Sequence, residues 1–283
     1  MSSDDQYLFW QTMGATAALL AITIVPILFS RQRVLLERWL VWATLSAAIL
    51  VAWLLGQPGL ITLATLAAVT LITELMRLYK FANWSIAVAV VVAIVAGQLS
   101  RDPERLALLG MPTLFAAGLI LGFLAAPQGV RSKGAVVLGL AFAWLIWTSL
   151  FLQTAQAIAT LWVVACFDVA AWAGGRFLAR GPLAWHFSPK ASPNKTLAGL
   201  IVGAFGALVA MVAIDEFNPY AFVVIVVLAT LGDFIESRVK RGLGVKDASN
   251  WLPGFGGLLD RFDSLLLLLP LTSVYSLLPL FRV

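Results

Sequence analysis

The chain has 283 residues, of which 61% are hydrophobic and only 12% are charged, and its mean hydropathy is +0.95. About a quarter of the residues of a typical soluble domain are charged, so this composition excludes an ordinary soluble protein and indicates an integral membrane protein. One cysteine and one histidine exclude an intrachain disulfide and a metal cluster built from several cysteines or histidines.

Apolar runs long enough to cross about 30 Å of hydrocarbon recur along nearly the whole chain. The first run follows a short acidic start without the basic region of a signal peptide, so we expect it to be retained as a span. The expected spans cover residues 8–29, 39–55, 60–76, 84–99, 106–126, 135–153, a segment from 157 to about 175, 197–214, 220–235 and 265–278. The sequence predicts an all-α polytopic bundle of about nine to ten transmembrane helices. We expect one membrane domain, 1–283, with a hydrophobic multispan region at 1–133 and a half at 134–283 that carries the polar motifs.

The net charge of +5 could suggest a nucleic-acid partner, so the position of the charges matters more than their sum. If both termini lie outside, sixteen of the nineteen Lys and Arg residues fall on inside loops. This bias is typical of the positive-inside rule, and it places the two long polar segments, 177–196 and 232–264, in the cytoplasm. Topology and anionic headgroups explain the basic excess, so no nucleic-acid partner is expected. A multi-pass protein of the cell membrane, the inner membrane in a bacterium, is predicted.

The segment 232–264 gathers acids, bases and glycines in a chain that is otherwise close to hydrocarbon, and burying such groups without partners costs several kcal/mol each. Asp233, Asp260 and Asp263 are candidate ligands of Mg²⁺, which prefers oxygen donors and commonly uses one or two carboxylates plus substrate phosphates. Asp168, near the end of an earlier apolar run, is a further candidate. The alternatives are solvated charges beside the membrane for the acids and an internal pair with Arg176 for Asp168.

Basic residues interleave with these acids, which suits a site where acids hold a metal and bases clamp phosphoryl oxygens. The alternative is that the basic residues anchor anionic lipid. Prolines at 182, 189 and 193 make a continuous helix in 177–196 unexpected. Gly254, Gly256 and Gly257 form a loop whose bare backbone could approach a phosphate, although a plain turn would look similar.

Several of these motifs resemble those of a known family. Ser237-x-x-Lys240-Arg241, then Lys246-Asp247 and the run from Pro253 through Gly254, Gly256 and Gly257 to Asp260-Arg261-x-Asp263, resemble the signature of phosphatidate cytidylyltransferases, the CDP-diacylglycerol synthases. Two further pieces are similar to the same family: Asp168-x-x-Ala171-Trp172-x-x-Gly175-Arg176, and Ser188-Pro189-Lys190 followed by Ser192-Pro193-Asn194-Lys195-Thr196. The likeness covers 168–264, and the first 130 residues match only as a hydrophobic multispan region.

The resemblance implies transfer of a cytidylyl group from CTP to phosphatidate in the membrane, giving CDP-diacylglycerol and pyrophosphate, with Mg²⁺ as cofactor and 134–283 as the catalytic half. It implies catalytic roles for Asp233, Asp260, Lys240, Arg241, Lys246 and Asp247. It implies substrate binding by Ser188, Lys190, Ser192, Asn194, Lys195, Thr196, Arg176, Ser237, Gly254, Gly256, Gly257 and Arg261. It implies metal binding by Asp233, Asp260, Asp263 and Asp168. A homodimer is compatible with it.

The sequence departs from the family pattern at Phe255, where the usual P-G-H-G-G loop has histidine, and phenylalanine cannot donate to a phosphate. We expect activity to survive, because pyrophosphate held by a metal and by cations needs little protonation to leave. Two alternatives stay open. One is a catalytically weak or altered-acceptor relative that acts as a lipid-binding or assembly subunit. The other is a transporter, which would need polar residues across the midplane beyond Asp168 and Glu74.

Overall fold

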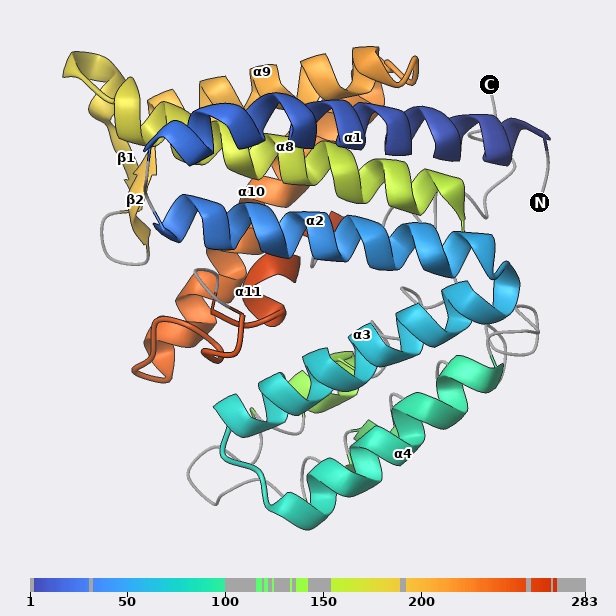
Figure 1. The fold of residues 1–283 in the computed structure, drawn as a ribbon. Helices are drawn as coiled ribbons and strands as arrows, with labels where there is room; N and C mark the ends of the chain where they lie inside the picture. Colours follow the sequence, from blue (N-terminus) through green and yellow to red (C-terminus); the bar gives the residue numbers. More distant parts are fainter. Residues whose placement is uncertain are drawn as a thin grey trace. The chain divides into compact units, whose positions relative to one another are not determined.

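The computed structural model describes residues 3–30, 33–99, 154–188, 192–252 and 256–265, with short pieces at 116–118, 120–121, 124, 133, 136–141 and 267–268. Its long helices are α1 (Ser3–Ser30), α2 (Arg33–Leu54), α3 (Gln57–Leu78), α4 (Asn83–Leu99), α8 (Ala155–Phe177), α9 (Leu197–Ala213) and α10 (Pro219–Gly242) (Figure 1). A short helix, α11 (Leu259–Phe262), a 3₁₀ turn, η3 (Gly181–Ala184), and two short strands, β1 (His186–Ser188) and β2 (Ser192–Thr196), complete the described elements.

Five of these helices are long and apolar enough to cross a membrane, judged by length and composition: 3–29 of α1, 35–54 of α2, and the whole of α3, α8 and α10. Helices α4 and α9 are apolar but shorter, at 17 residues each. The chain is therefore an α-helical membrane protein, as the sequence predicted. The total of nine to ten spans stays a prediction, because the expected spans at 106–126, 135–153 and 265–278 lie largely outside the described residues.

The chain forms two compact units that alternate along the sequence. The first comprises Met1–Trp39, Thr154–Lys246 and Arg261–Leu271, and the second comprises Leu40–Gln153, Asp247–Asp260 and Thr272–Val283. Each unit thus combines segments that are far apart in sequence. The expected division into 1–133 and 134–283 within one membrane domain stays a prediction.

In the first unit, glycines allow α8 and α9 to lie close together. A Cβ on Gly203 would lie 2.9 Å from the Cβ of Ala171, and one on Gly206 would lie 2.5 Å from the Cβ of Ala170. Such small-residue contacts are the usual way in which membrane helices approach closely, since burial from lipid supplies little driving force between them. This packing holds α8, the helix that carries Asp168.

Polar caps begin three helices of this unit. Thr154 caps α8 and accepts a hydrogen bond from the backbone N–H of Ala157, and Asn218 caps α10 and accepts one from the N–H of Tyr220. Thr196 caps α9, and its hydroxyl oxygen accepts from the N–H of Gly199 at 3.1 Å. Each cap satisfies an N–H that the first turn leaves without a helical partner.

Two helices extend further than their apolar runs. Helix α10 continues from the expected end at 235 to Gly242, because no proline or glycine interrupts it and Glu236 and Lys240 pair one turn apart. Helix α2 begins at Arg33, so Arg33 and Arg38 lie on a helix and not in the loop expected there. Hydropathy alone set the limits of the expected spans 39–55 and 220–235, so these spans do not include the charged ends of the two helices.

The polar segment 177–196 folds as η3 and an antiparallel hairpin of β1 and β2, with His186 opposite Thr196 and Ser188 opposite Ser192. Pro182 lies in the first turn of η3. The expected absence of a continuous helix is confirmed for the described residues of this segment. The hairpin returns the chain to the start of α9, so Lys195 lies two residues before Leu197, the first residue of that helix.

The second unit contains the antiparallel pair α3 and α4 (Figure 1). Gly97 of α4 meets Thr65 of α3, where a Cβ would lie 2.1 Å from the threonine hydroxyl oxygen. The buried face of α3 is apolar except for Thr65 and Glu74, and only 5% of Glu74 is exposed. A buried carboxylate in a membrane helix requires partners, and the second unit supplies them.

Candidate active site

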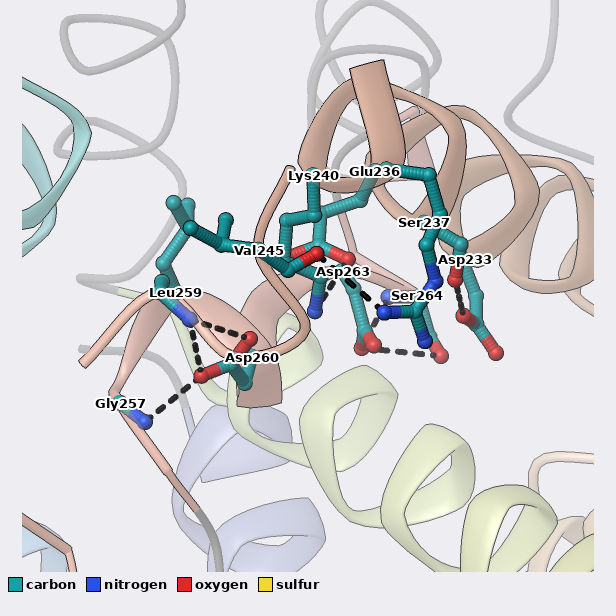
Figure 2. Close-up of polar contacts among 12 residues, drawn as sticks. Asp233, Glu236, Ser237, Lys240, Val245, Gly257, Leu259, Asp260, Asp263 and Ser264 are labelled. Atoms are coloured by element: carbon teal, nitrogen blue, oxygen red, sulfur yellow. Dashed lines mark hydrogen bonds and ion pairs between the residues drawn. The ribbon is translucent and has the colours of Figure 1, made fainter. Parts of the chain in front are cut away.

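An acidic cluster lies in the first unit, formed by Asp168 of α8, Asp233 of α10 and Asp263, which follows α11. Ser264 connects two members: its hydroxyl donates to Oδ1 of Asp168 at 2.9 Å, and its backbone N–H donates to Oδ1 of Asp263 at 2.7 Å. We refer to Asp168, Asp233 and Asp263 as the acidic cluster; Figure 2 labels Asp233, Asp263 and Ser264. Three carboxylates from separate segments of the sequence therefore face one region of the protein.

A glycine contact brings α10 against the backbone of 263–264. A Cβ on Gly232 would lie 2.5 Å from the carbonyl oxygen of Asp263 and 3.5 Å from that of Ser264. Real Cβ atoms essentially never approach backbone so closely, so the position requires glycine. Asp233 follows Gly232 in the sequence. The close packing at Gly232 therefore sets the distance between Asp233 and Asp263.

The carboxyl of Asp263 is buried beside the carboxylate of Asp233. Burial, and after it the negative charge of Asp233, raise the pKa of the Asp263 carboxyl to about 7. Arg261, the N–H of Ser264 and Lys240 act in the opposite direction without offsetting the shift. A carboxyl with a raised pKa in a polar site is typical of functional sites, and a bound cation would favour its ionised form.

Lys195 supplies the closest positive charge to Asp233, with which it forms an ion pair. Its Nζ also lies 4.4 Å from the ring centroid of Phe234, within cation–π range. Ser237, one turn after Asp233, donates its hydroxyl to Oδ1 of that residue at 3.3 Å (Figure 2). The structure therefore places Lys195, Asp233 and Ser237, three predicted site residues, in contact.

Lys240 is buried and pairs with Glu236 at 2.7 Å. Glu236 was not among the predicted site residues, although Glu and Lys four residues apart on a helix are the usual signal for such a pair. Arg241 donates to the carbonyl of Val245 at 3.3 Å and closes the turn after α10. Lys246 is exposed and has the freedom to reach a ligand.

Arg176, at the end of α8, is exposed, and its guanidinium lies 5.9 Å from the ring centroid of Trp172. Arg38 lies over the same ring at 5.5 Å. Two cations therefore flank one tryptophan in the first unit. Arg261 lies close enough to Asp168 and Asp263 to act on both carboxyls electrostatically.

In the second unit, we call residues 247–252 and 256–260 the signature loop; its last two residues, Leu259 and Asp260, begin α11. Asp260 is buried at 3% exposure and organises the signature loop by accepting hydrogen bonds from the backbone N–H of Ala248, at 2.9 and 3.1 Å, and from that of Gly257, at 2.7 Å. Figure 2 shows the contact between Gly257 and Asp260. Leu252 and Gly256 exchange two backbone hydrogen bonds. The predicted metal ligand Asp260 thus has a structural role in this loop, and Asp247 is exposed.

The glycines of the signature loop approach carboxylates. Gly256 has φ +85°, and a Cβ there would lie 2.6 Å from Oδ2 of Asp260. A Cβ on Gly257 would lie 2.6 Å from Oε1 of Glu74. The approach of these glycines to a phosphate stays a prediction; the side-chain atoms beside them in the structure are carboxylate oxygens and, at Gly257, also the hydroxyl oxygen of Ser249. In the sequence, Glu74 is only a charged residue within the expected span 60–76, and no contact is predicted for it.

Several predicted residues cannot be placed by their side chains. Lys190, Gly254 and Phe255 lie outside the described residues. Ser188, Ser192 and Asn194 belong to β1 and β2 by their backbone. Thr196 is buried and caps α9, so its hydroxyl oxygen already accepts one hydrogen bond.

The fold and these contacts define a class: an α-helical membrane protein with carboxylates and cations gathered on α8, on α10 and in the residues around α11. The chain belongs to the Cytidylyltransferase family, which matches residues 15–278. This result confirms the resemblance seen in the motifs.

Individual relatives match a shorter stretch. The chain is 40% identical over 116 residues to a phosphatidate cytidylyltransferase of Staphylococcus aureus (strain COL), which covers 38% of this chain and 43% of that protein. It is 40% identical over 121 residues to a phosphatidate cytidylyltransferase of Helicobacter pylori, covering 39% and 44%. The chain therefore spans less than half the length of these curated relatives.

Proposed function

We propose that the protein transfers the cytidylyl group of CTP to phosphatidate, forming CDP-diacylglycerol and pyrophosphate. The observation that carries the proposal is the acidic cluster with Lys195 in a chain that matches the Cytidylyltransferase family over 15–278. The relatives named above are phosphatidate cytidylyltransferases. The lipid substrate keeps its acyl chains in the bilayer, which suits a site on apolar helices.

The donor chemistry of the acidic cluster suits Mg²⁺. Asp168, Asp233 and Asp263 offer carboxylate oxygens, and the raised pKa of Asp263 reflects burial and, after it, the negative charge of Asp233, which a cation would offset. Within the described residues, no group of three or more His, Cys, Asp or Glu side chains is arranged to hold a metal ion by itself. Mg²⁺ usually keeps waters and substrate phosphates as ligands, so an incomplete protein cage suits it. We propose that these three residues hold the ion together with substrate phosphates, and the metal role of Asp260 stays a prediction. When bound, the ion would neutralise phosphate charge.

The reaction requires alignment of two anions more than it requires a base. A phosphate oxygen of phosphatidate, already ionised near neutral pH, attacks the α-phosphorus of CTP, and the bond from that phosphorus to the bridging oxygen breaks to release pyrophosphate. Lys195 and Arg261 lie beside the acidic cluster, where they could contact phosphoryl oxygens. The exposed Arg176, Arg241 and Lys246 could clamp the triphosphate or the lipid phosphate.

We further propose that the site faces the cytoplasm of a bacterial inner membrane. The support is the charge bias of the loops, with sixteen of nineteen basic residues on one side of the predicted topology. CTP is a cytoplasmic nucleotide, so this placement would give the enzyme its soluble substrate directly.

The experiment that tests the function is an assay of purified protein with labelled CTP, Mg²⁺ and phosphatidate in mixed micelles, run on the natural protein and on Phe255→His. We expect the natural protein to form CDP-diacylglycerol. A single lost phosphate hydrogen bond costs roughly 1.5–3 kcal/mol, so Phe255→His should improve CTP binding by about tenfold to a hundredfold at most. Activity in Phe255→His alone would refute the proposal for the natural chain. No activity in either would favour a different acceptor or a role in lipid binding or assembly.

A further inference from the structure

Glu74 is a buried carboxylate that the chemistry above does not use, and it receives four hydrogen bonds from the signature loop. Its Oε1 accepts from the hydroxyl of Ser249 at 2.7 Å, from the indole N–H of Trp251 at 2.5 Å and from the backbone N–H of Leu258 at 3.0 Å. Its Oε2 accepts from the backbone N–H of Leu259 at 2.7 Å. All four of these groups donate to the carboxylate oxygens of Glu74, so the loop offers this side chain donors matched to its acceptors.

These partners lie 175 to 185 residues away from Glu74 in the sequence, so one side chain of α3 ties both limbs of the signature loop. Ser249 and Trp251 belong to its first limb, and Leu258 and Leu259 belong to its second. Gly257 completes the contact, since a Cβ there would lie 2.6 and 2.8 Å from the two carboxylate oxygens. The loop is thus shaped to admit this carboxylate.

The same loop carries family residues. Asp260 holds it from within, through Ala248 and Gly257, and Glu74 holds it from α3. Without Glu74, the N–H groups of Leu258 and Leu259 would be buried beside the turn that precedes Asp260 and would lack these acceptors. Buried N–H groups without partners are costly, so the loop would rearrange, and Asp260 with it.

We propose that Glu74 is a positioning residue that fixes the signature loop, and with it Asp260, in the arrangement needed for cytidylyl transfer. This inference rests on the proposed function. Glu74 acts through the loop and does not itself touch a reacting atom. Its effect should therefore be seen in kcat and in the protection of the loop's amides, and only weakly in KM for CTP.

The test uses the full-length protein in detergent and the variant Glu74→Gln. The amide has the same shape, but its NH₂ group donates, so at least one donor of the loop would face another donor. We expect kcat to fall at least tenfold with KM for CTP changed less than threefold. Amide hydrogen exchange in peptides covering 248–252 and 256–260 should accelerate at least tenfold, and exchange in α10 should not change.

The matched control is Glu37→Gln on α2, which removes the same charge from a residue paired with Arg33 four positions away. It should leave kcat and loop exchange unchanged. Trp251→Phe removes only one of the four donors and leaves an aromatic ring in place, so it should give a smaller change in the same direction. It also provides the measurement if Glu74→Gln does not fold.

The outcomes separate the two proposals. No turnover in the natural protein refutes the proposed function, whereas the exchange data still report whether Glu74 orders the loop. The positioning role is overturned if Glu74→Gln turns over within twofold of the natural enzyme. If that variant does not fold, the same result in Trp251→Phe overturns it. A lower unfolding temperature with unchanged kcat per folded molecule overturns it too, because that result would assign Glu74 to stability alone.

Discussion

Replacing Gly232 with alanine should separate Asp233 from Asp263 without removing any polar group. The new Cβ would lie 2.5 Å from the carbonyl oxygen of Asp263, and ordinary contact begins at 3.4 Å, so α10 or the 263–264 backbone must move by about 0.9 Å. Overpacking of this kind costs about 1–3 kcal/mol, and the gain of helix propensity from glycine to alanine returns about 1 kcal/mol of it. A displacement near 1 Å at a reacting centre costs on the order of a hundredfold in rate.

We therefore expect Gly232→Ala to lower kcat for cytidylyl transfer by about a hundredfold while the unfolding midpoint falls by only a few degrees. Gly242→Ala is the matched control, because it lies on the same helix and nothing lies within 4 Å of the added Cβ. The assay is turnover per folded molecule in mixed micelles, with thermal unfolding measured on the same samples. Natural turnover in a folded Gly232→Ala protein would refute the argument that this contact sets the spacing of the acidic cluster.

Three further predictions concern charge and topology. Asp233→Asn should lower turnover by about a hundredfold or more, since losing about 3 kcal/mol of charge stabilisation has that effect; near-natural turnover at limiting Mg²⁺ would remove the residue from the site. Because the pKa of Asp263 is raised to about 7, the folded metal-free protein keeps a proton that the unfolded chain releases near pH 4. Its stability should fall as pH rises toward 7 and then level off, and unfolding midpoints that rise from about pH 5 to pH 7 would contradict this sign. A cysteine at Lys190 on a Cys166→Ala background should resist impermeant reagents in intact cells, and labelling from outside would reverse the predicted topology.

Much of the architecture follows from local sequence because a bilayer leaves few choices. Hydrocarbon offers no hydrogen-bond partners, so an apolar run of sufficient length must form a helix, and the limits of α3, α4 and α9 agree with the expected spans within a few residues. Hydropathy did not predict the charged end of α10, which continues to Gly242 beyond the expected limit at 235. A helix can extend past an apolar run as long as its backbone hydrogen bonds continue. The family motifs were also readable, since their spacing is a local property of the chain.

The sequence by itself determined the membrane class, the helical runs and the list of chemically suitable residues. Only the tertiary structure decided which of them meet: Asp168 with Ser264, Lys195 with Asp233, and Glu74 with the signature loop. Nothing in the spacing of Glu74 and Leu258, 184 residues apart, predicts that contact. The physical reason is that a buried carboxylate requires several donors, whereas the donors available to it depend on how distant helices and loops pack.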